Sequence, residues 1–352
     1  MRRICLFAAA LALMVPAGTV PADLQVTLQQ NLNGYTGVKD TWTGNNHDYY
    51  NHGGETTMSA FSGMGDPRFK VLIRFDGLDA AIPVADASDI TGAALHLYKS
   101  AGQSGYDYGS VTAYRALQPW TEGTRTDSQN TSTIDGANNM YDRPPTSVTG
   151  GWTNTLGYTR VKELDVTGKT IDHVQWNFPI YASNWVEVNS IQEVEDTAPG
   201  NGGAWFQDGD TLYFSETRGF DATYGISYYQ PEDAWDARGA TGAADADQAA
   251  GSEETGDWPD DTATGWGSVD ITDWVRAWWG DSSSNFGMVL TSGGKEGSWR
   301  TSEYNAGGGE DPDDWTYGPK LVVTYVPEPA AAALLAVGGL GLLMRRRRRP
   351  RV

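Results

Sequence analysis

The chain has 352 residues, of which 39% are hydrophobic, and it carries a net charge of −20 with a single cysteine. So acidic a chain lacks the basic patch that nucleic-acid binding requires, and we expect no nucleic-acid partner. One cysteine also excludes an intramolecular disulfide framework.

The first 22 residues have the layout of a secretory signal peptide. Two arginines precede the apolar run Ile4–Val15, and small residues follow, so that cleavage after Ala17 or after Ala22 fits equally well. Cys5 lies in this segment, so the exported chain has no cysteine. We therefore expect its folding to depend on packing alone, or on packing plus a metal.

The C-terminal segment, residues 326–352, has three parts in a fixed order. A proline-flanked motif is followed by the apolar run 330–344 and an arginine cluster; the motif and cluster residues are Val326, Pro327, Glu328, Pro329, Arg345, Arg346, Arg347, Arg348 and Arg349. The apolar run is short for a transmembrane helix of roughly 20 residues, but the arginines form a strong cytoplasmic anchor. An ordinary tail anchor is one interpretation of this order.

The same order closely resembles the PEP-CTERM sorting signal. The resemblance implies that an exosortase-type enzyme recognises the tail and that the protein reaches the cell surface or the extracellular matrix. The segment 330–344 would then anchor it in the membrane at least transiently. Without the eight arginines of the two ends, the rest of the chain has a net charge of about −28, so anionic polymers would be repelled at long range.

The body, residues 23–325, is long enough for one large or two small domains. Alternating apolar patterns between Gly, Asp and Asn turns predict short strands, and long helical periodicity is absent. This pattern predicts an all-β sandwich or jelly roll. The predicted strands are Leu24–Leu28, Gly34–Trp42, Val71–Asp76, Ile90–Tyr98, Val111–Leu117, Trp299–Tyr304 and Lys320–Tyr325.

The segment Gly267–Leu290 predicts a strand, a short helix and a second strand. Trp274, Val275 and Trp278 fall on one helical face. We expect this helix to close one end of the sandwich, with its tryptophans packed in the core.

Several stretches of the body together resemble the DNRLRE domain, which is also classed as carbohydrate-binding module family ninety-six. They are VLIRFDGL (71–78), ITGAALHLY (90–98), PWTEGT (119–124), DAWDARGATGAADAD (233–247), VDITDWVRAWW (269–279), NFGMVL (285–290), RTSEYN (300–305) and PKLVVTY (319–325). The resemblance implies a β-jelly-roll with a binding or adhesive role.

The chain departs from that pattern in the middle. An insertion of about 100 residues, roughly 125–222, precedes the next matching strand, here Tyr224–Tyr229. The insertion either adds strands to the sandwich or forms a second lobe. Short similarities such as Asp165-Val166-Thr167 to Asp270-Ile271-Thr272 fit a partial internal duplication, and they fit chance equally well. Residues 240–265, rich in Ala, Gly and Asp, predict a long flexible loop.

No catalytic motif stands out, and we predict that the protein is not an enzyme. His47 and His52 are five residues apart, unlike the helical spacing of a zinc protease. A Gly-x-Ser-x-Gly elbow and an exported cysteine nucleophile are both missing. The many carboxylates leave a polysaccharide hydrolase or lyase as a less favoured alternative.

Acidic turns are candidate sites for structural calcium, because hard cations prefer six to eight oxygen ligands. The candidates are Asp311, Asp313 and Asp314; the run Asp257–Asp261; and Asp40 with Asp48 and Asn51. Solvated turns without an ion are the simpler interpretation, and no other cofactor is expected.

Four tryptophans of the insertion, Trp152, Trp176, Trp185 and Trp205, have glycine and polar neighbours that suggest exposure. Exposed rings would stack on sugar faces, whereas buried ones would belong to a core. We therefore expect an exported, non-catalytic surface or matrix protein that binds polysaccharide or a cell-surface glycan. The alternative is a structural or adhesive surface protein without a small ligand.

Overall fold

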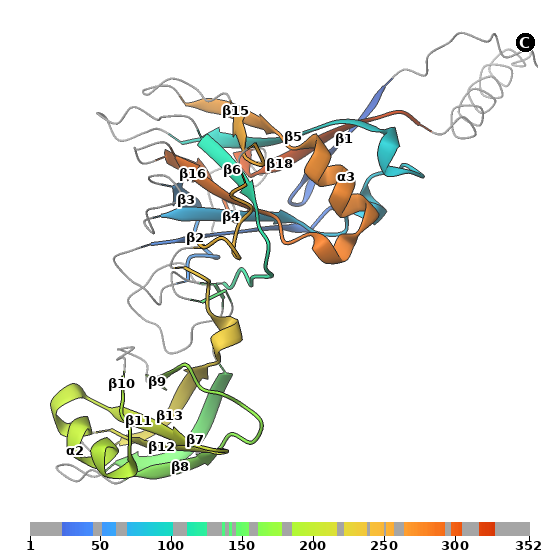
Figure 1. The fold of residues 1–352 in the computed structure, drawn as a ribbon. Coiled ribbons are helices and arrows are strands. Elements are labelled where there is room, and N and C mark those ends of the chain that lie inside the picture. The colour runs from blue at the N-terminus through green and yellow to red at the C-terminus, as the bar shows by residue number, and fades with distance from the viewer. Residues whose placement is uncertain are drawn as a thin grey trace, which may run out of the picture.

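The chain folds into two lobes built mainly from antiparallel strands (Figure 1). The computed structural model describes residues 23–44, 51–60, 69–100, 111–124, 136–137, 141–142, 146–154, 161–177, 185–216, 222–237, 240–249, 251–256, 264–292, 297–304 and 317–327. The predicted signal peptide and the apolar run 330–344 lie outside these residues. Within them, no helix combines the length and the apolar character needed to cross a membrane.

The first lobe is a sandwich of two sheets. One sheet has, in order, β1 (Leu24–Gln29), β18 (Lys320–Tyr325), β5 (Ile90–Lys99), β17 (Gly297–Arg300) and β3 (Thr57–Ala60), and β15 (Gly265–Asp270) also pairs with β5. The other has β14 (Glu254–Gly256), β6 (Val111–Arg115), β16 (Met288–Ser292), β4 (Lys70–Phe75) and β2 (Val38–Thr43). The all-β prediction is confirmed, and the predicted strands agree with these bounds most closely at β1, β4, β5 and β18.

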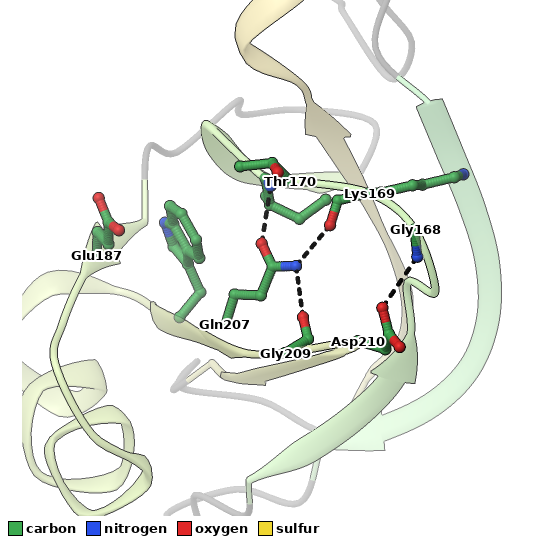
Figure 2. A pocket seen from close by; sticks show the side chains of 9 residues that line it. Gly168, Lys169, Thr170, Glu187, Gln207, Gly209 and Asp210 are labelled. Carbon is green, nitrogen blue, oxygen red and sulfur yellow. Dashed lines mark hydrogen bonds between the residues drawn. The ribbon is translucent and has the colours of Figure 1, made fainter.

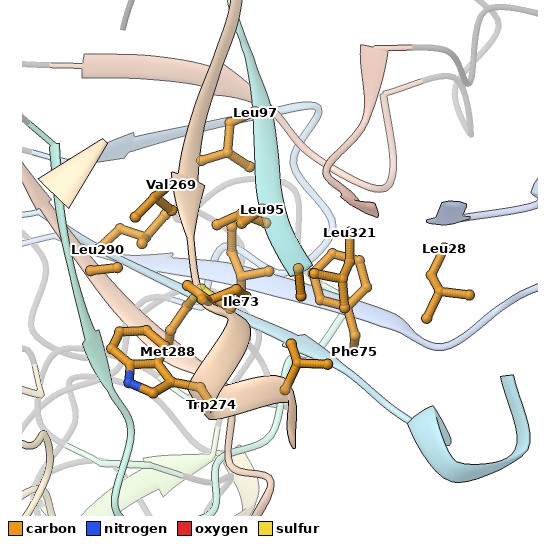
Figure 3. Packing of buried hydrophobic residues seen from close by; sticks show 14 of the residues in the cluster. Leu28, Ile73, Phe75, Leu95, Leu97, Val269, Trp274, Met288, Leu290 and Leu321 are labelled. Atoms are coloured by element: carbon orange, nitrogen blue, oxygen red, sulfur yellow. The ribbon is translucent and has the colours of Figure 1, made fainter. Parts of the chain in front are cut away.

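The core of the first lobe lies between these two sheets (Figure 3). Leu95 and Leu97 of β5 face Ile73 of β4 and Leu290 of β16, and all four side chains are buried. The pattern follows from alternation, because successive side chains of a strand point to opposite faces. His96 is accordingly only half-buried. The inward residues that the sequence predicted for β5 are therefore confirmed.

One end of the sandwich is closed by α3 (Thr272–Gly280), as predicted. Its apolar face, formed by Trp274, Val275 and Trp278, is buried in the core of the first lobe. Smaller helical turns complete the connections: α1 (Leu78–Ala81), η1 (Leu32–Gly34), η2 (Ala87–Asp89), η3 (Pro231–Asp233) and η4 (Ser282–Ser284).

The second lobe contains the insertion. It has a three-stranded sheet of β7 (Thr146–Asn154), β13 (Ala222–Tyr229) and β9 (His173–Asn177), and a four-stranded sheet of β10 (Val186–Glu187), β11 (Ala204–Asp208), β12 (Thr211–Ser215) and β8 (Lys162–Asp165). Helix α2 (Ile191–Asn201) packs on β11 and β12. These strands pair only with one another among the described residues, so the insertion forms its own lobe rather than widening the sandwich.

The strand at 224–229 belongs to this second lobe, which corrects its predicted place in the sandwich. Both hydrogen-bonding edges of β13 are used by insertion strands, β7 on one side and β9 on the other. Its alternate residues Ile226 and Tyr228 are buried in the core of the second lobe. The insertion therefore extends through Tyr229.

The similarity between the two lobes is local. In Asp165–Thr167 and in Asp270–Thr272, the threonine N–H and hydroxyl both donate to one oxygen of the aspartate, at 2.9 and 2.6 Å in each case. An aspartate two positions before a threonine can form this turn in any fold, because its side chain reaches the backbone two residues on. The following elements differ, because Trp176 lies in strand β9 and Trp278 in helix α3. The shared turn therefore favours chance over duplication.

The segment 240–265 is not a flexible loop in its described parts, which corrects that prediction. Asp245 is buried, and its two oxygens accept hydrogen bonds from the N–H groups of Asp236, Ala237 and Gly242. One short side chain thus satisfies three backbone donors and holds a compact turn. Ala246 then packs on the outer face of the second sheet of the first lobe. Composition alone cannot reveal a carboxylate used in this way.

Candidate functional site

Three carboxylates from distant parts of the chain meet in the first lobe. Asp40, Glu122 and Glu303 each place a carboxylate oxygen within 4.8 Å of the other two. Asp40 belongs to β2, Glu122 to the loop after β6, and Glu303 to the turn after β17. Their charges would repel one another in water, so the fold brings them together against a cost.

Asp40 is held inside the sandwich by the alternation of β2. Val38 faces the core, and Asp40, two residues later on the same face, is 0% exposed. Among the described strands, β2 is the last strand of its sheet and pairs only with β4. The N–H of Asp40 is thus free to donate to Oε1 of Glu122 at 2.7 Å. Glu122 therefore covers part of an open sheet edge.

The loop that carries Glu122 is fixed by Trp120. Trp120 donates its indole N–H to the carbonyl of Phe286 at 2.7 Å and accepts a bond at its own carbonyl from Arg74 at 3.2 Å. The Arg74 guanidinium also lies 5.2 Å from the centre of the Trp120 ring. With the loop fixed, Oε2 of Glu122 forms an ion pair with Nζ of Lys39 at 2.9 Å.

Asn51 joins three loops behind Glu122. Its side-chain amide donates to the carbonyls of Glu122 and of Ala137, the latter at 2.8 Å, and its oxygen accepts from the N–H of Gly53. Gly123 adopts φ +77°, and a Cβ there would collide with the Asn51 side chain. The loops approach so closely because glycine stands at these points.

We expect Gly123→Ala to lower the free energy of unfolding by about 2–4 kcal/mol, through an unfavourable left-handed backbone and the displacement of Asn51. Gly77→Ala is the matched control, because Gly77 has φ +68° but an added Cβ there meets no atom within 4 Å. Its cost should be about 1–2 kcal/mol for the backbone alone. Urea unfolding of both variants measures the difference, and equal losses would contradict the proposed packing.

Ser302 connects the third carboxylate to the first. Its N–H donates to Oδ2 of Asp40 at 2.8 Å, and its hydroxyl donates to Oε1 of Glu303, also at 2.8 Å. Two oxygens receive no such bond: Oδ1 of Asp40 and Oε2 of Glu303 are buried and have no hydrogen-bond partner in the part of the chain that the structure describes. The cluster thus has unused acceptors directed inside the protein.

All three carboxylates have raised pKa values. For Asp40, burial is the main cause and the charges of Glu303 and Glu122 add to it, so the pKa lies well above its usual range. Burial and the charge of Glu122 raise the pKa of Glu303 to about 7. Burial also raises the pKa of Glu122, and it outweighs the bonds from the Asp40 N–H and Lys39. Protons or a cation are therefore needed to neutralise the cluster near pH 7.

A second feature is an open pocket of about 530 Å³ in the second lobe (Figure 2). Gln207 bridges its two turns: its amide N–H groups donate to the carbonyls of Lys169 and Gly209, and its oxygen accepts from the N–H of Ile171. Oδ1 of Asp210 accepts from the N–H of Gly168 at 2.9 Å. Glu187 stands on the opposite side of the pocket. The pocket is thus lined mainly by polar groups.

The tryptophans predicted to contact sugar are placed differently from that expectation. Trp185 and Trp205 are 3% and 2% exposed, so neither offers an open ring face, although Trp205 is one of the residues that line the pocket. Trp185 stacks on Phe214, and a Cβ at Gly203 would collide with its ring. Gly203, which follows much later in the chain, therefore leaves room for the buried ring of Trp185. Trp152 and Trp176 lie in β7 and β9, and their side chains are outside the described residues.

Of the predicted calcium ligands, Asp40 and Asn51 lie at the carboxylate cluster. Asn51 contacts the backbone of Glu122 rather than Asp40. Asp48, Asp257–Asp261 and the turn with Asp311, Asp313 and Asp314 lie outside the described residues, as does the sorting segment beyond Pro327. The sequence analysis did not select Glu122 and Glu303 as ligands. Both nevertheless lie in stretches that carry the DNRLRE resemblance, 119–124 and 300–305.

In comparisons with known proteins, no family model matches this chain, and no curated protein matches it significantly.

Proposed function

We propose that the chain is an exported, non-catalytic protein of the cell surface or extracellular matrix, with a jelly-roll body that binds polysaccharide. The resemblance of its tail to a PEP-CTERM signal supports the location, with an exosortase-type enzyme as a partner. The resemblance of its body to the DNRLRE domain supports the binding role. The two-sheet first lobe is compatible with a jelly roll.

The observation that carries the binding proposal is the polar pocket of the second lobe. It is open to solvent and flanked by the carboxylates of Glu187 and Asp210. Carboxylates accept hydrogen bonds from sugar hydroxyls, and an open pocket suits one or two units of a long polymer. The strong negative charge of the body favours neutral polysaccharides over anionic ones.

The carboxylate cluster supports a non-catalytic role. A glycosidase needs two carboxyl groups that face the same bound sugar. Asp40 is 0% exposed, and Glu122 and Glu303 are only partly exposed, so the three carboxylates are poorly placed to face one bound sugar. The perturbed pKa values are thus better explained by burial within the fold than by catalysis.

Binding is tested with the full-length chain on a glycan array and on insoluble polysaccharides. We expect Glu187→Ala to weaken binding of a recognised neutral polysaccharide about 5- to 10-fold, because a charged hydrogen-bond acceptor is lost. Glu195→Ala is the matched control, since Glu195 is exposed on α2 of the same lobe and does not line the pocket.

Equal affinities of the two variants would contradict the pocket as the binding site. A folded chain that binds none of the polysaccharides would favour the alternative, a structural or adhesive surface protein. Release of reducing ends or of unsaturated products would instead indicate a hydrolase or a lyase.

A further inference from the structure

We propose that Asp40, Glu122 and Glu303 bind one calcium ion, which fastens the edge strand β2 to two loops of the first lobe. This inference does not depend on polysaccharide binding, because the cluster and the polar pocket lie in different lobes.

Two carboxylate oxygens of the cluster lack the ligand that burial requires. Asp40 is 0% exposed, and its Oδ1 and the buried Oε2 of Glu303 have no hydrogen-bond partner among the described residues. A buried acceptor that has lost water and gained no donor is costly to the folded state. The partner oxygens of the same two carboxylates are already bonded to Ser302. A cation placed among the carboxylates would satisfy both unused oxygens at once.

The cluster also carries more negative charge than the nearby cations neutralise. The three ionised carboxylates face one ammonium group, that of Lys39, which contacts Glu122 on its outer side. The other nearby cation, Arg74, is bonded to Asp76 and to the Trp120 carbonyl. The deprotonated cluster therefore carries an excess of about two negative charges, which one divalent cation would neutralise.

The ligand atoms of the cluster also favour calcium over other ions. The ligand atoms are carboxylate oxygens, which are the preferred ligands of hard cations, whereas zinc and copper favour nitrogen or sulfur. Calcium binds oxygen at about 2.3–2.6 Å, so two of its ligands lie at most about 5 Å apart. The carboxylate oxygens of the cluster, within 4.8 Å of one another, meet this limit. Magnesium is less suited, because it retains several waters and Asp40 is buried.

The experiment measures bound metal and thermal stability of the full-length chain at pH 8. The protein is dialysed against calcium chloride, passed through a desalting column and analysed for calcium, magnesium and zinc. Thermal unfolding is then followed with excess calcium chloride and with excess chelator. We expect about one calcium per chain from the cluster and a rise in Tm of about 5 °C with saturating calcium.

Two isosteric variants locate the ion. Asp40→Asn and Glu303→Gln each remove one negative charge and keep the side-chain volume, so both should fold. In chelator at pH 8, each variant should melt at a higher temperature than the unaltered chain, because repulsion is relieved. Each should also retain one calcium fewer and lose most of the Tm rise. Glu232→Gln is the matched control at an exposed residue of η3 and should behave like the unaltered chain.

Three results would overturn the proposal. Equal Tm values of the unaltered chain in calcium and in chelator would mean that protons alone neutralise the cluster. Calcium retained equally by Asp40→Asn and Glu303→Gln would place the ion elsewhere, for example at the acidic run 311–314. Retention of magnesium or zinc in preference to calcium would contradict the choice of ion.

Discussion

Trp278→Ala is expected to lower the free energy of unfolding of the first lobe by about 3–5 kcal/mol, the usual range for removing a buried tryptophan. The Trp278 side chain is 2% exposed and lies between the two sheets, where α3 closes the sandwich. Its ring also packs near Trp274, with 6.1 Å between ring centres. The vacated volume cannot collapse easily, because strands from both sheets border it.

The neighbouring residue provides the control for this prediction. Trp279 lies on the same helix but is only partly buried, so Trp279→Ala removes an equal side chain and should cost about 1–2 kcal/mol. Calorimetry resolves the transitions of the two lobes if they unfold separately. Similar losses for both variants would contradict the described orientation of α3 toward the core.

The stability of the calcium-free protein is expected to fall as the pH rises from about 4.5 to about 7, by about 2–3 kcal/mol from Glu303 alone. The pKa of Glu303 rises from 4.5 to about 7 on folding, with burial as the first cause and the charge of Glu122 as the second. Between these values the folded state binds more protons than the unfolded state, so increasing pH favours unfolding. The stability that Glu303 contributes to the folded state is fully present below pH 4.5 and is lost as the pH rises through 7.

Asp40 and Glu122 also make the folded state less stable as the pH rises, since their pKa values are raised, chiefly by burial. The charge of Lys39 opposes this rise in the pKa of Glu303 and so moderates the effect. Urea unfolding in chelator measures the profile at several pH values. Glu303→Gln serves as the reference, and its stability relative to the unaltered chain should improve steadily from pH 4.5 to 7.5. A constant difference between the two proteins over this range would contradict the raised pKa.

Most strands of the first lobe, though not β3 and β14, could be predicted from the sequence because their signal is local. In β5 and β18, buried apolar residues alternate with half-buried residues on the outer face, and this period of two is visible without any knowledge of partners. The helix α3 was predictable for the same reason, since its three buried residues recur at helical spacing.

Predictions from neighbouring residues were wrong where a residue contacts a part of the chain that is not adjacent to it in the sequence. Asp245 looked like part of a flexible acidic loop, but it binds three backbone N–H groups of a compact turn. Trp185 was expected to be exposed among polar neighbours, but Gly203, which is distant in the sequence, leaves room for its buried ring. The strand β13 matched the pattern of a sandwich strand, yet its hydrogen bonds are made with the insertion.

For this protein, the sequence by itself determined the all-β class, the inward face of the main strands and the closing helix, because each depends on the spacing of neighbouring residues. It also indicated Asp40 as a candidate calcium ligand, together with Asn51 and with Asp48, which lies outside the described residues. Only the tertiary structure decided that Glu122 and Glu303 join it. Those residues lie far along the chain, and the pairing of edge strand β2, the loop after β6 and the turn after β17 is what brings their carboxylates within 4.8 Å.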